Sequence, residues 1–309
     1  MSGLKVSMAV TTYNQEKYLA ECLDSILVQK TNFNYEILIA DDASTDQTRL
    51  IAESYFKKHP DKIRLLSRDK NIGTTRNLDD TLKQCSGEYI VIFDGDDIMR
   101  PGKLQKQVDF LDSNPEYVLV AHHLNEFQDP DRKTTRIIKP PVNKKFYGIK
   151  DLIRYGSLFG NTSKMFRRTA LPPNGIHKGI HLITDMYITL HIVKEGKAGY
   201  IPIVLGDYRR HVDAMMNNAN GKKIFEDIVL TLDSLDNLYG NKYKYLYRYR
   251  LAYGYFMYGI HEMHSGNFSS ARHKFLQSIR HDSFRGVSQY IYLIMSFLPP
   301  YFIKNKIVN

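Results

Sequence analysis

The first 125 residues alternate between short apolar runs and longer stretches that carry apolar residues at helical spacing. The runs KVSMAV, YEILIA, IRLLS and EYIVIF predict strands. Between the first two runs, Leu19, Cys22, Leu23 and Ile26 recur every three or four residues, as on one face of a helix. Alternation of this kind predicts an α/β fold, in which a mixed, mostly parallel sheet is covered by helices on both faces.

Three further helices are expected in this region. Ser44 and Gln47 form a capping-box pattern, which predicts a helix that runs to about His59. The segment TTRNLDDTLKQC predicts the next helix, and a third is expected after Pro101, ending near Asp112. Each of these helices therefore separates two predicted strands.

The pattern changes in the second half of the chain. YVLVAHH predicts a strand, residues 129–145 a charged and mobile loop, residues 182–195 a helix, and GYIPIVL another strand. The remaining residues are helical in pattern, and SGNFSSARHKFLQSI resembles one hairpin of a tetratricopeptide-type repeat. A single copy favours an ordinary helical tail. We therefore expect a first domain at 1–215 and a C-terminal α-helical region at 216–309.

The overall charge narrows the classes of partner. The 309 residues carry a formal net charge of +10, which suits phosphorylated ligands, an anionic membrane face or nucleic acid. Because the positive charge is scattered and does not form a stripe with aromatic platforms, the sequence disfavours nucleic acid.

Cysteine usage and hydropathy indicate the compartment. Cys22 and Cys85 lie in helix-like patterns rather than at metal-type spacings, which favours a reducing compartment. No secretory apolar region is visible, and no apolar run reaches the roughly 20 residues that span a bilayer. We expect a cytoplasmic protein, with peripheral attachment to the inner face of the cell membrane as an alternative.

Polar motifs stand where the predicted strands end. TTYN, ADDAST and DGDD each follow an apolar run, and in parallel sheets ligands bind beyond the carboxyl ends of the strands. DGDD places Asp94, Asp96 and Asp97 within four positions, where like charges are costly unless a cation or strong donors compensate. A simple surface turn is the alternative. Since hard divalent cations take carboxylate oxygens, this edge is a candidate site for a nucleoside diphosphate and its cation.

Four segments together resemble a known family. SMAVTTYNQEKYLAECLDSILVQ, EILIADDASTDQT, NIGTTRNL and GEYIVIFDGDDIMRPGKL resemble, in order and spacing, the family 2 glycosyltransferases with the GT-A fold. The resemblance covers residues 4–125 closely and continues to about 215 more loosely. It implies inverting transfer of a sugar from a nucleotide-sugar donor, most readily a UDP-sugar, with Mn²⁺ or Mg²⁺ on the diphosphate. It also implies a glycan or lipid-linked acceptor, as in bacterial surface polysaccharide assembly.

The resemblance assigns roles at the nucleotide end of the site. Thr11 and Tyr13 would frame the base, and Asp42 would hydrogen-bond the edge of the base. Arg76, in TTRN, would reach the nucleotide. For Asp42 the alternative is a core or capping role, and for Arg76 a solvated helix surface.

The resemblance also assigns the diphosphate end. Asp94 matches the acid that binds the ribose, and Asp96 matches the metal ligand of the DxD motif. His211, in DYRRHVDAMM, resembles a histidine that completes the metal site, with a surface imidazole as the alternative. Asp97 is expected to orient the turn or contact the backbone. Arg209 and Arg210, which precede this histidine, either steady the diphosphate or lie in a solvated basic loop.

The catalytic base is expected at the start of a helix. HLITDMYITLHI contains Thr184 and Asp185 where the resembled family usually has an acidic pair. Asp185 would take the proton from the acceptor hydroxyl as this hydroxyl attacks. Helix capping is the alternative role for this carboxylate. The preceding segment LFGNTSKMFRR, residues 158–168, resembles the part of the family that lines the acceptor pocket.

The C-terminal segment suggests a surface contact. GVSQYIYLIMSFLPPYFIKNKIVN is apolar and aromatic and ends in lysines, so it would suit a membrane interface. Packing against the first domain or against a partner subunit is the alternative, and the oligomeric state stays open.

Two other functions fit the composition less well. A sugar-nucleotide pyrophosphorylase-like nucleotidyltransferase is expected to have a Gly-rich, basic loop after the first strand, and TTYNQEKY is neither. A non-catalytic protein that binds anions or nucleic acid would explain the net charge, but the positive charge is scattered and forms no stripe with aromatic platforms.

Overall fold

The computed structural model describes residues 3–211, 221–283 and 286–297. The chain forms two compact units, and each is described separately. The first unit comprises Met1–Leu152, Ser157–Lys178 and Thr184–Ala214, and the second comprises Ile153–Gly156, Gly179–Ile183 and Met215–Asn309.

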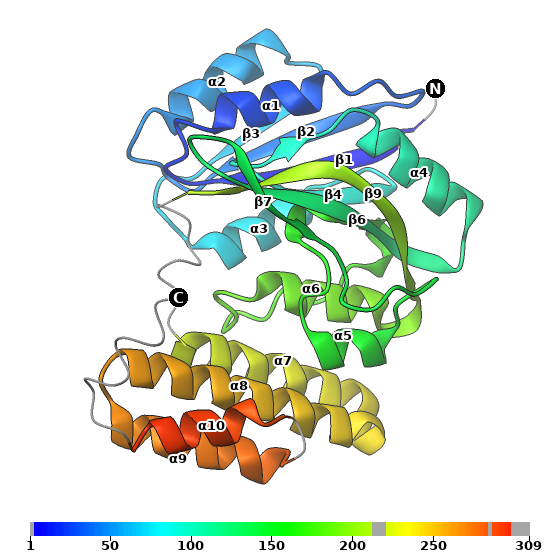
Figure 1. Cartoon of the computed structure of the whole chain (residues 1–309). Coiled ribbons are helices and arrows are strands. Elements are labelled where there is room, and N and C mark those ends of the chain that lie inside the picture. The colour runs from blue at the N-terminus through cyan, green and yellow to red at the C-terminus, as the bar shows by residue number, and fades with distance from the viewer. Residues whose placement is uncertain (1–2, 212–220, 284–285, 298–309) are drawn as a thin grey trace. The chain divides into compact units, whose positions relative to one another are not determined.

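Strands and helices alternate through the first two hundred residues (Figure 1). The strands are β1 (Val6–Thr12), β2 (Tyr35–Asp41), β3 (Ile63–Ser67), β4 (Tyr89–Asp94), β5 (Ile98–Met99), β6 (Tyr117–Gln128), β7 (Lys133–Ile138), β8 (Met165–Arg167) and β9 (Lys197–Arg210). The helices in the same part of the chain are α1 (Leu19–Leu27), α2 (Thr48–Lys58), α3 (Thr74–Leu82), α4 (Lys103–Ser113), α5 (Ile149–Tyr155) and α6 (Thr184–Ile192).

All nine strands form one mixed sheet. Its order is β3-β2-β1-β4-β8-β6-β9-β5, and β7 pairs with β6. The first four strands in this order are parallel, and β8 is antiparallel to both β4 and β6. Since β6 and β9 are parallel to each other, the carboxyl ends of β1, β2, β4, β6 and β9 all lie at one edge of the sheet. Ligands of such sheets bind at that edge.

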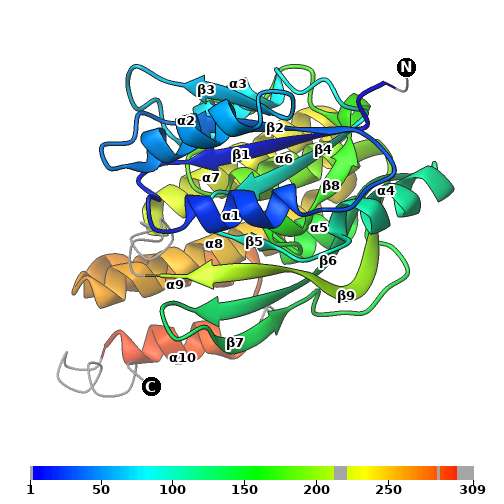
Figure 2. The same cartoon turned by 90° about the horizontal axis from the view of Figure 1, so that it is seen from above.

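The core lies between the sheet and its helices. Figures 1 and 2 show α1 and α2 on one face of the sheet and α3 and α6 on the other. Every residue of β2 is buried, as expected of a strand that is covered on both faces. Val10, Leu23, Phe93 and Leu104 belong to one fully buried cluster that joins the sheet to α1 and α4. The predicted fold class, a mixed and mostly parallel sheet with helices on both faces, is confirmed.

The predicted capping box is wrong. Helix α2 begins at Thr48, and the side chain of Asp46 accepts the backbone N–H of Thr48 at 2.9 Å. The hydroxyl of Ser44 donates instead to Asp41 at the end of β2, at 2.5 Å. Ser44 therefore stabilises the turn after the strand and does not cap the helix.

The expected mobile loop at 129–145 contains a strand. β7 pairs antiparallel with β6, so the two strands form a hairpin. Five of the six residues of β7 are exposed, and the strand is polar and basic. Because no apolar face is buried there, hydrophobic periodicity carries no signal for this strand.

The second unit is helical, as the sequence predicts. Its helices are α7 (Gly221–Tyr239), α8 (Lys244–His264), α9 (Phe268–His281) and α10 (Ser288–Met295). Phe256, Met263, Ala271 and Phe275 form its buried cluster across α8 and α9. Within the described ranges, no helix has both the length and the apolar character needed to cross a membrane.

Candidate active site

The acidic motif DGDD forms a tight turn at the end of β4. The backbone N–H of Asp97 donates to the carbonyl oxygen of Asp94 at 3.1 Å, and the N–H of Gly95 donates to Thr11 at 3.0 Å. A Cβ atom at Gly95 would lie 2.6 Å from the side chain of Gln15 and 3.1 Å from the carbonyl oxygen of Thr11. A side chain here would crowd the end of β1 and displace Gln15, so the close approach of the turn to β1 favours glycine.

Asp97 is a buried anchor. It accepts the hydroxyl of Thr162 and, at 2.9 Å, the backbone N–H of Arg209 in β9. Burial, followed by the charges of Asp96 and Asp94, raises the pKa of Asp97 well above its usual range. As the sequence predicts, Asp97 contacts the backbone and fixes the turn.

Asp94 is partly exposed at the end of β4. In the sheet it lies beside Thr11, and its Oδ1 accepts the amide of Asn161 at 3.3 Å. Burial, followed by the charge of Asp96, raises the pKa of Asp94 to about 7. An ionised Asp94 therefore needs further donors or a cation beside it, and a bound ligand would supply them.

Asp96, in the turn after β4, and His211, directly after β9, are brought together. Nε2 of His211 lies 3.0 Å from Oδ2 of Asp96. The His211 ring packs against Tyr18, with 4.6 Å between the ring centroids. The sequence places these residues 115 positions apart, and the sheet makes them neighbours.

This pair fits a divalent cation. Asp96 offers a carboxylate and His211 an imidazole nitrogen. No cluster of three or more His, Cys, Asp or Glu residues suited to a metal occurs in the described ranges. Two protein ligands are sufficient for Mg²⁺ or Mn²⁺ when phosphate oxygens and water complete the coordination.

Arg209 is part of an internal network and is not free to bind phosphate. Its side chain is 2% exposed, and its guanidinium donates to the Asp96 carbonyl oxygen at 2.8 Å and to Asp129 and Glu21 at 2.6 Å each. The alternative of a solvated basic loop is also wrong for this residue, because β9 continues to Arg210. Arg209 therefore fixes the main chain of Asp96 through a hydrogen bond to its carbonyl oxygen.

Asp42 supports a neighbouring loop at the nucleotide end. It is buried, and its two oxygens accept the backbone N–H groups of Ile72 at 2.8 Å and Gly73 at 2.9 Å. Gly73 has a φ of +87° and immediately precedes α3, which carries the exposed Arg76. Tyr13 is 45% exposed just beyond the end of β1. The predicted roles of these residues toward the base stay predictions.

Asp185 lies in the first turn of α6. It is partly exposed, and its charge contributes to the raised pKa of Asp94, so the two carboxylates interact across the site. Thr184, which replaces the first acid of the family pair, is buried and shares a 2.8 Å hydrogen bond with Thr75 at the start of α3. This hydrogen bond therefore links α3 to α6 beside Asp185.

The segment 158–168 contributes two residues that sequence reasoning did not single out. Asn161 contacts Asp94, and Lys164 is a buried lysine whose charge interacts with Asp94 and Asp185. The only signal in the sequence is a polar GNTSK stretch between two apolar runs.

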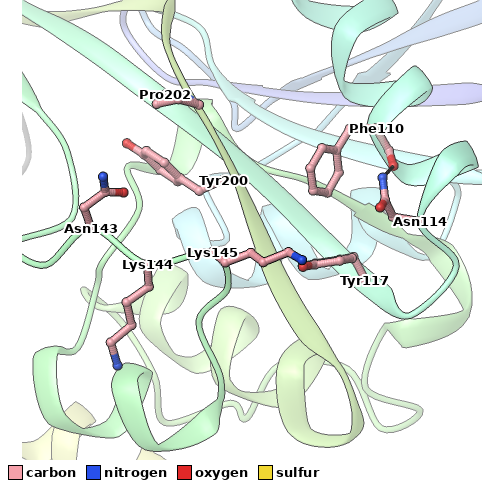
Figure 3. Close-up of a pocket in the computed structure, with 8 residues that line it drawn as sticks. All are labelled: Phe110, Asn114, Tyr117, Asn143, Lys144, Lys145, Tyr200 and Pro202. Carbon is pink, nitrogen blue, oxygen red and sulfur yellow. Dashed lines mark hydrogen bonds between the residues drawn. The ribbon is translucent and has the colours of Figure 1, made fainter.

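A pocket of about 410 Å³ lies at the opposite edge of the sheet (Figure 3). Tyr117 opens β6, and Tyr200 lies near the start of β9, so the pocket is at the amino ends of these strands. In Figure 3 the side chain of Lys145 extends toward Tyr117, whereas Lys144 points away. None of the predicted site residues lines this pocket.

The fold and the acidic turn define a class of enzyme. A mixed sheet with carboxylates at the end of its fourth strand is the arrangement of GT-A glycosyltransferases. Residues 7–171 match the model of glycosyl transferase family 2, and the chain belongs to this family. The protein is therefore a glycosyltransferase.

Curated relatives agree with this assignment. The chain is 32% identical over 202 residues to the putative glycosyltransferase EpsE of Bacillus subtilis, covering 64% of this chain and 70% of EpsE. It is 30% identical over 249 residues to an uncharacterised protein of Mycobacterium tuberculosis, covering 77% of this chain and 70% of the relative.

Solved structures share the fold. Residues 1–349 of S. aureus TarS in complex with UDP-GlcNAc align with a TM-score of 0.70 at 18% identity, covering 95% of this chain and 89% of that chain. A mannosyltransferase from Pyrobaculum calidifontis in complex with GDP-Man and Mn²⁺ aligns with a TM-score of 0.57 at 18% identity, covering 98% and 89%.

Proposed function

We propose that this glycosyltransferase is a metal-dependent, inverting enzyme of surface polysaccharide synthesis. It would transfer a hexose-type sugar from a nucleoside-diphosphate sugar to a hydroxyl of a glycan or lipid-linked acceptor. The observation that carries the proposal is the Asp96–His211 pair beside Asp94, at the edge of the sheet where the strands end.

In this proposal the donor lies across the ends of β1, β2 and β4. Thr11 and Tyr13 frame the base, Asp42 binds the edge of the base, and Arg76 reaches the nucleotide. Each oxygen of Asp42 holds one backbone N–H and keeps a second lone pair for the base. Asp94, which lies beside Thr11 in the sheet, binds a ribose hydroxyl.

The diphosphate lies at Asp96 and His211. Mn²⁺ or Mg²⁺ held there would offset the negative charge that develops on the departing nucleoside diphosphate. Arg209 fixes the Asp96 backbone, so this carboxylate is held in place before the donor arrives. Such preorganisation is where much of the rate enhancement of enzymes originates.

Asp185 acts as the general base. Its carboxylate takes the proton from the acceptor hydroxyl while the hydroxyl oxygen attacks the anomeric carbon from the face opposite the leaving group. The new C–O bond forms as the bond to the diphosphate breaks, so the anomeric configuration inverts. The partial exposure of Asp185 leaves it accessible to an acceptor.

Relatives indicate which donors to test first. Two TarS structures are complexes with UDP-GlcNAc and with UDP, whereas the Pyrobaculum enzyme is a complex with GDP-Man and Mn²⁺. UDP-sugars are therefore our first candidates. One curated relative, AmsE of Erwinia amylovora, is a glycosyltransferase of amylovoran biosynthesis and is 25% identical over 218 residues. This supports polysaccharide synthesis as the setting.

We further propose that α10 attaches the protein to an anionic membrane surface. Ile291, Ile294 and Phe297 are 48%, 65% and 69% exposed on or just after this helix. The basic residues Lys304 and Lys306 lie outside the described residues. Attachment would bring the enzyme to lipid-linked acceptors on the cytoplasmic face.

The test is a donor screen that measures nucleoside-diphosphate release in the presence of Mn²⁺. Water serves as a slow acceptor, so a donor can be identified before the acceptor is known. We expect one UDP-sugar to be hydrolysed faster than the GDP- and dTDP-sugars. Pyrophosphate release from a nucleoside triphosphate and a sugar 1-phosphate, without hydrolysis of any nucleotide sugar, would instead indicate the nucleotidyltransferase.

A further inference from the structure

Lys164 is a lysine in the interior of the first unit. It lies between the short turn Asn161–Ser163 and β8, and it is 2% exposed. Thr189 Oγ1, at 3.2 Å, is the one hydrogen-bond partner of its ammonium among the described residues. A buried ammonium is costly unless other charges compensate, so its surroundings need an explanation.

Two carboxylates of the candidate active site supply that compensation. The charges of Asp185 and Asp94 both stabilise the ammonium of Lys164. Burial has the larger effect and lowers the pKa of Lys164, which the two carboxylates partly offset. Asp94 and Asp185 are partly exposed whereas Lys164 is buried, so the ammonium is more deeply buried than either carboxylate.

A second connection runs through α6. The hydroxyl of Thr189 accepts from Lys164 and donates to the backbone carbonyl oxygen of Asp185 at 2.6 Å. Lys164 therefore contacts the helical turn that carries Asp185 and also faces the charge of the Asp185 side chain.

Lys103 provides a comparison within the same unit. It is also fully buried, but its ammonium donates to the neutral side chain of Gln107 at 2.8 Å and lies 5.8 Å from the centroid of the Phe93 ring. Burial alone lowers the pKa of Lys103 to about 7. The carboxylate surroundings of Lys164 are therefore not a general property of buried lysines in this chain.

We propose that Lys164 is a positioning residue for sugar transfer, whose buried positive charge holds the Asp185 carboxylate beside Asp94, facing the acceptor hydroxyl. The inference rests on the proposed function, because it takes Asp185 to be the general base. Two carboxylates on neighbouring elements repel each other, and the buried ammonium balances that repulsion. The acceptor proton still goes to Asp185, and Lys164 exchanges no proton in the reaction.

A double-mutant cycle with Lys164→Met and Asp185→Asn tests the proposal. Methionine keeps the length of the side chain and removes its charge. In the wild-type background we expect Lys164→Met to lower kcat by about tenfold or more, with the donor KM changed less than about threefold. In the Asp185→Asn background the same substitution should change the residual rate by less than about twofold, because the carboxylate that Lys164 positions for proton transfer is gone.

Two further variants separate charge from packing. Lys164→Gln keeps a hydrogen-bond donor for Thr189 but carries no charge, so its transfer rate should fall as much as that of Lys164→Met. If the methionine variant does not fold, Lys164→Gln replaces it in the double-mutant cycle. Lys103→Met removes a buried ammonium away from the carboxylates and should keep transfer within about twofold of wild type.

The outcomes distinguish the two proposals. Equal losses from Lys164→Met in both backgrounds would overturn the role of Lys164 and leave the proposed function intact. Wild-type transfer by Lys164→Gln would do the same. Full transfer by Asp185→Asn alone would overturn the base assignment, and the inference about Lys164 with it.

Discussion

The Nε2 atom of His211 lies 3.0 Å from the Oδ2 atom of Asp96, although 115 positions separate the two residues in the sequence. This contact joins the turn after β4 to the end of β9. Arg209, two residues before His211, also donates to the backbone of Asp96. Two independent contacts therefore fix the predicted metal ligand.

We expect Asp96→Ala to abolish transfer and weaken donor binding, because the carboxylate is the main anionic ligand of the pair. His211→Ala should give a milder loss that high Mn²⁺ partly restores. Donor hydrolysis measured against Mn²⁺ concentration checks both. Full activity after chelation would contradict the metal role, and an unchanged Mn²⁺ dependence would return His211 to a structural role beside Tyr18.

Asp185→Asn keeps the size of the side chain and removes its basicity. If Asp185 is the general base, this substitution should lower the rate of sugar transfer by roughly 10²–10⁴-fold. Nucleotide and Mn²⁺ affinity should stay near wild type, because Asp94 and Asp96 are intact. Measured turnover, nucleotide affinity and Tm distinguish this from helix capping, which predicts near-normal turnover and a loss of at most about 1 kcal/mol in stability.

Asp42→Ala should weaken binding of the free nucleoside diphosphate and so raise its Kd. The expected loss of binding free energy is about 1–3 kcal/mol, because a buried hydrogen-bond acceptor is removed. The structure adds a second cause, since Ile72 and Gly73 lose the acceptor of their N–H groups. Asp42→Asn is the matched variant. Its one side-chain oxygen can accept only one of the N–H groups of Ile72 and Gly73, and its amide group replaces the other carboxylate oxygen that would face the base. Unchanged affinity by calorimetry in both variants would restrict Asp42 to a structural role.

Arg209→Met should destabilise the first unit by about 1–3 kcal/mol, because Asp129 and Glu21 lose the hydrogen bonds of the buried guanidinium. The loss is limited because Glu21 is 36% exposed and keeps its contact with Arg132. Arg210→Met is the control, since Arg210 is exposed and its nearest carboxylate, Glu126, is 3.9 Å away. Urea unfolding of both variants measures the difference. Equal stability would show that the network contributes little.

The same network predicts a pH dependence. Burial raises the pKa of Glu21, but hydrogen bonds from Arg132 and Arg209 outweigh it, and the net pKa is lowered. A lowered carboxyl pKa stabilises the fold above the unfolded-state pKa, and this contribution is lost as the pH falls toward the folded-state pKa. Wild type should therefore lose more stability than Arg209→Met between about pH 5 and pH 3.

The membrane proposal is tested with Ile291→Ser combined with Ile294→Ser. These substitutions should lower binding to vesicles of anionic lipid and leave donor hydrolysis unchanged, because the nucleotide residues are all on the first unit. Leu238→Ser is the control, as this residue of α7 is 52% exposed and outside the proposed surface. Vesicle co-sedimentation that is equal in all variants would exclude α10 as the contact.

The sequence predicted the sheet and the strand-end acids because both depend on local pattern. The apolar runs before Thr12, Asp41 and Asp94 have the length and burial of central strands, and turn residues follow each one. β7 was missed because its stabilisation comes from pairing with β6, which leaves no periodic apolar face. The capping box was wrong because the hydroxyl of Ser44 accepts the backbone N–H of Asn14 and donates to Asp41, both outside the helix.

The contacts within the site depend on pairings that local pattern does not specify. Asp97 accepts the backbone N–H of Arg209, and Lys164 donates to Thr189. Both contacts arise because β8 and β9 pair with strands that come much earlier in the sequence. Arg209 is polar and flanked by charge in the sequence, and only the three partners of its guanidinium explain its burial.

The hydrogen bond between Thr75 and Thr184 has a further consequence for the kinetics of the enzyme. Asp42 holds Gly73 at the start of α3, and Thr75, two residues later, shares a hydrogen bond with Thr184 beside Asp185. The nucleotide end and the base end of the site are thus joined by a short chain of contacts. Coupling between two sites is reciprocal, so any coupling carried by these contacts acts equally in both directions. We expect the donor to raise the affinity for the acceptor and the acceptor to raise the affinity for the donor by the same factor.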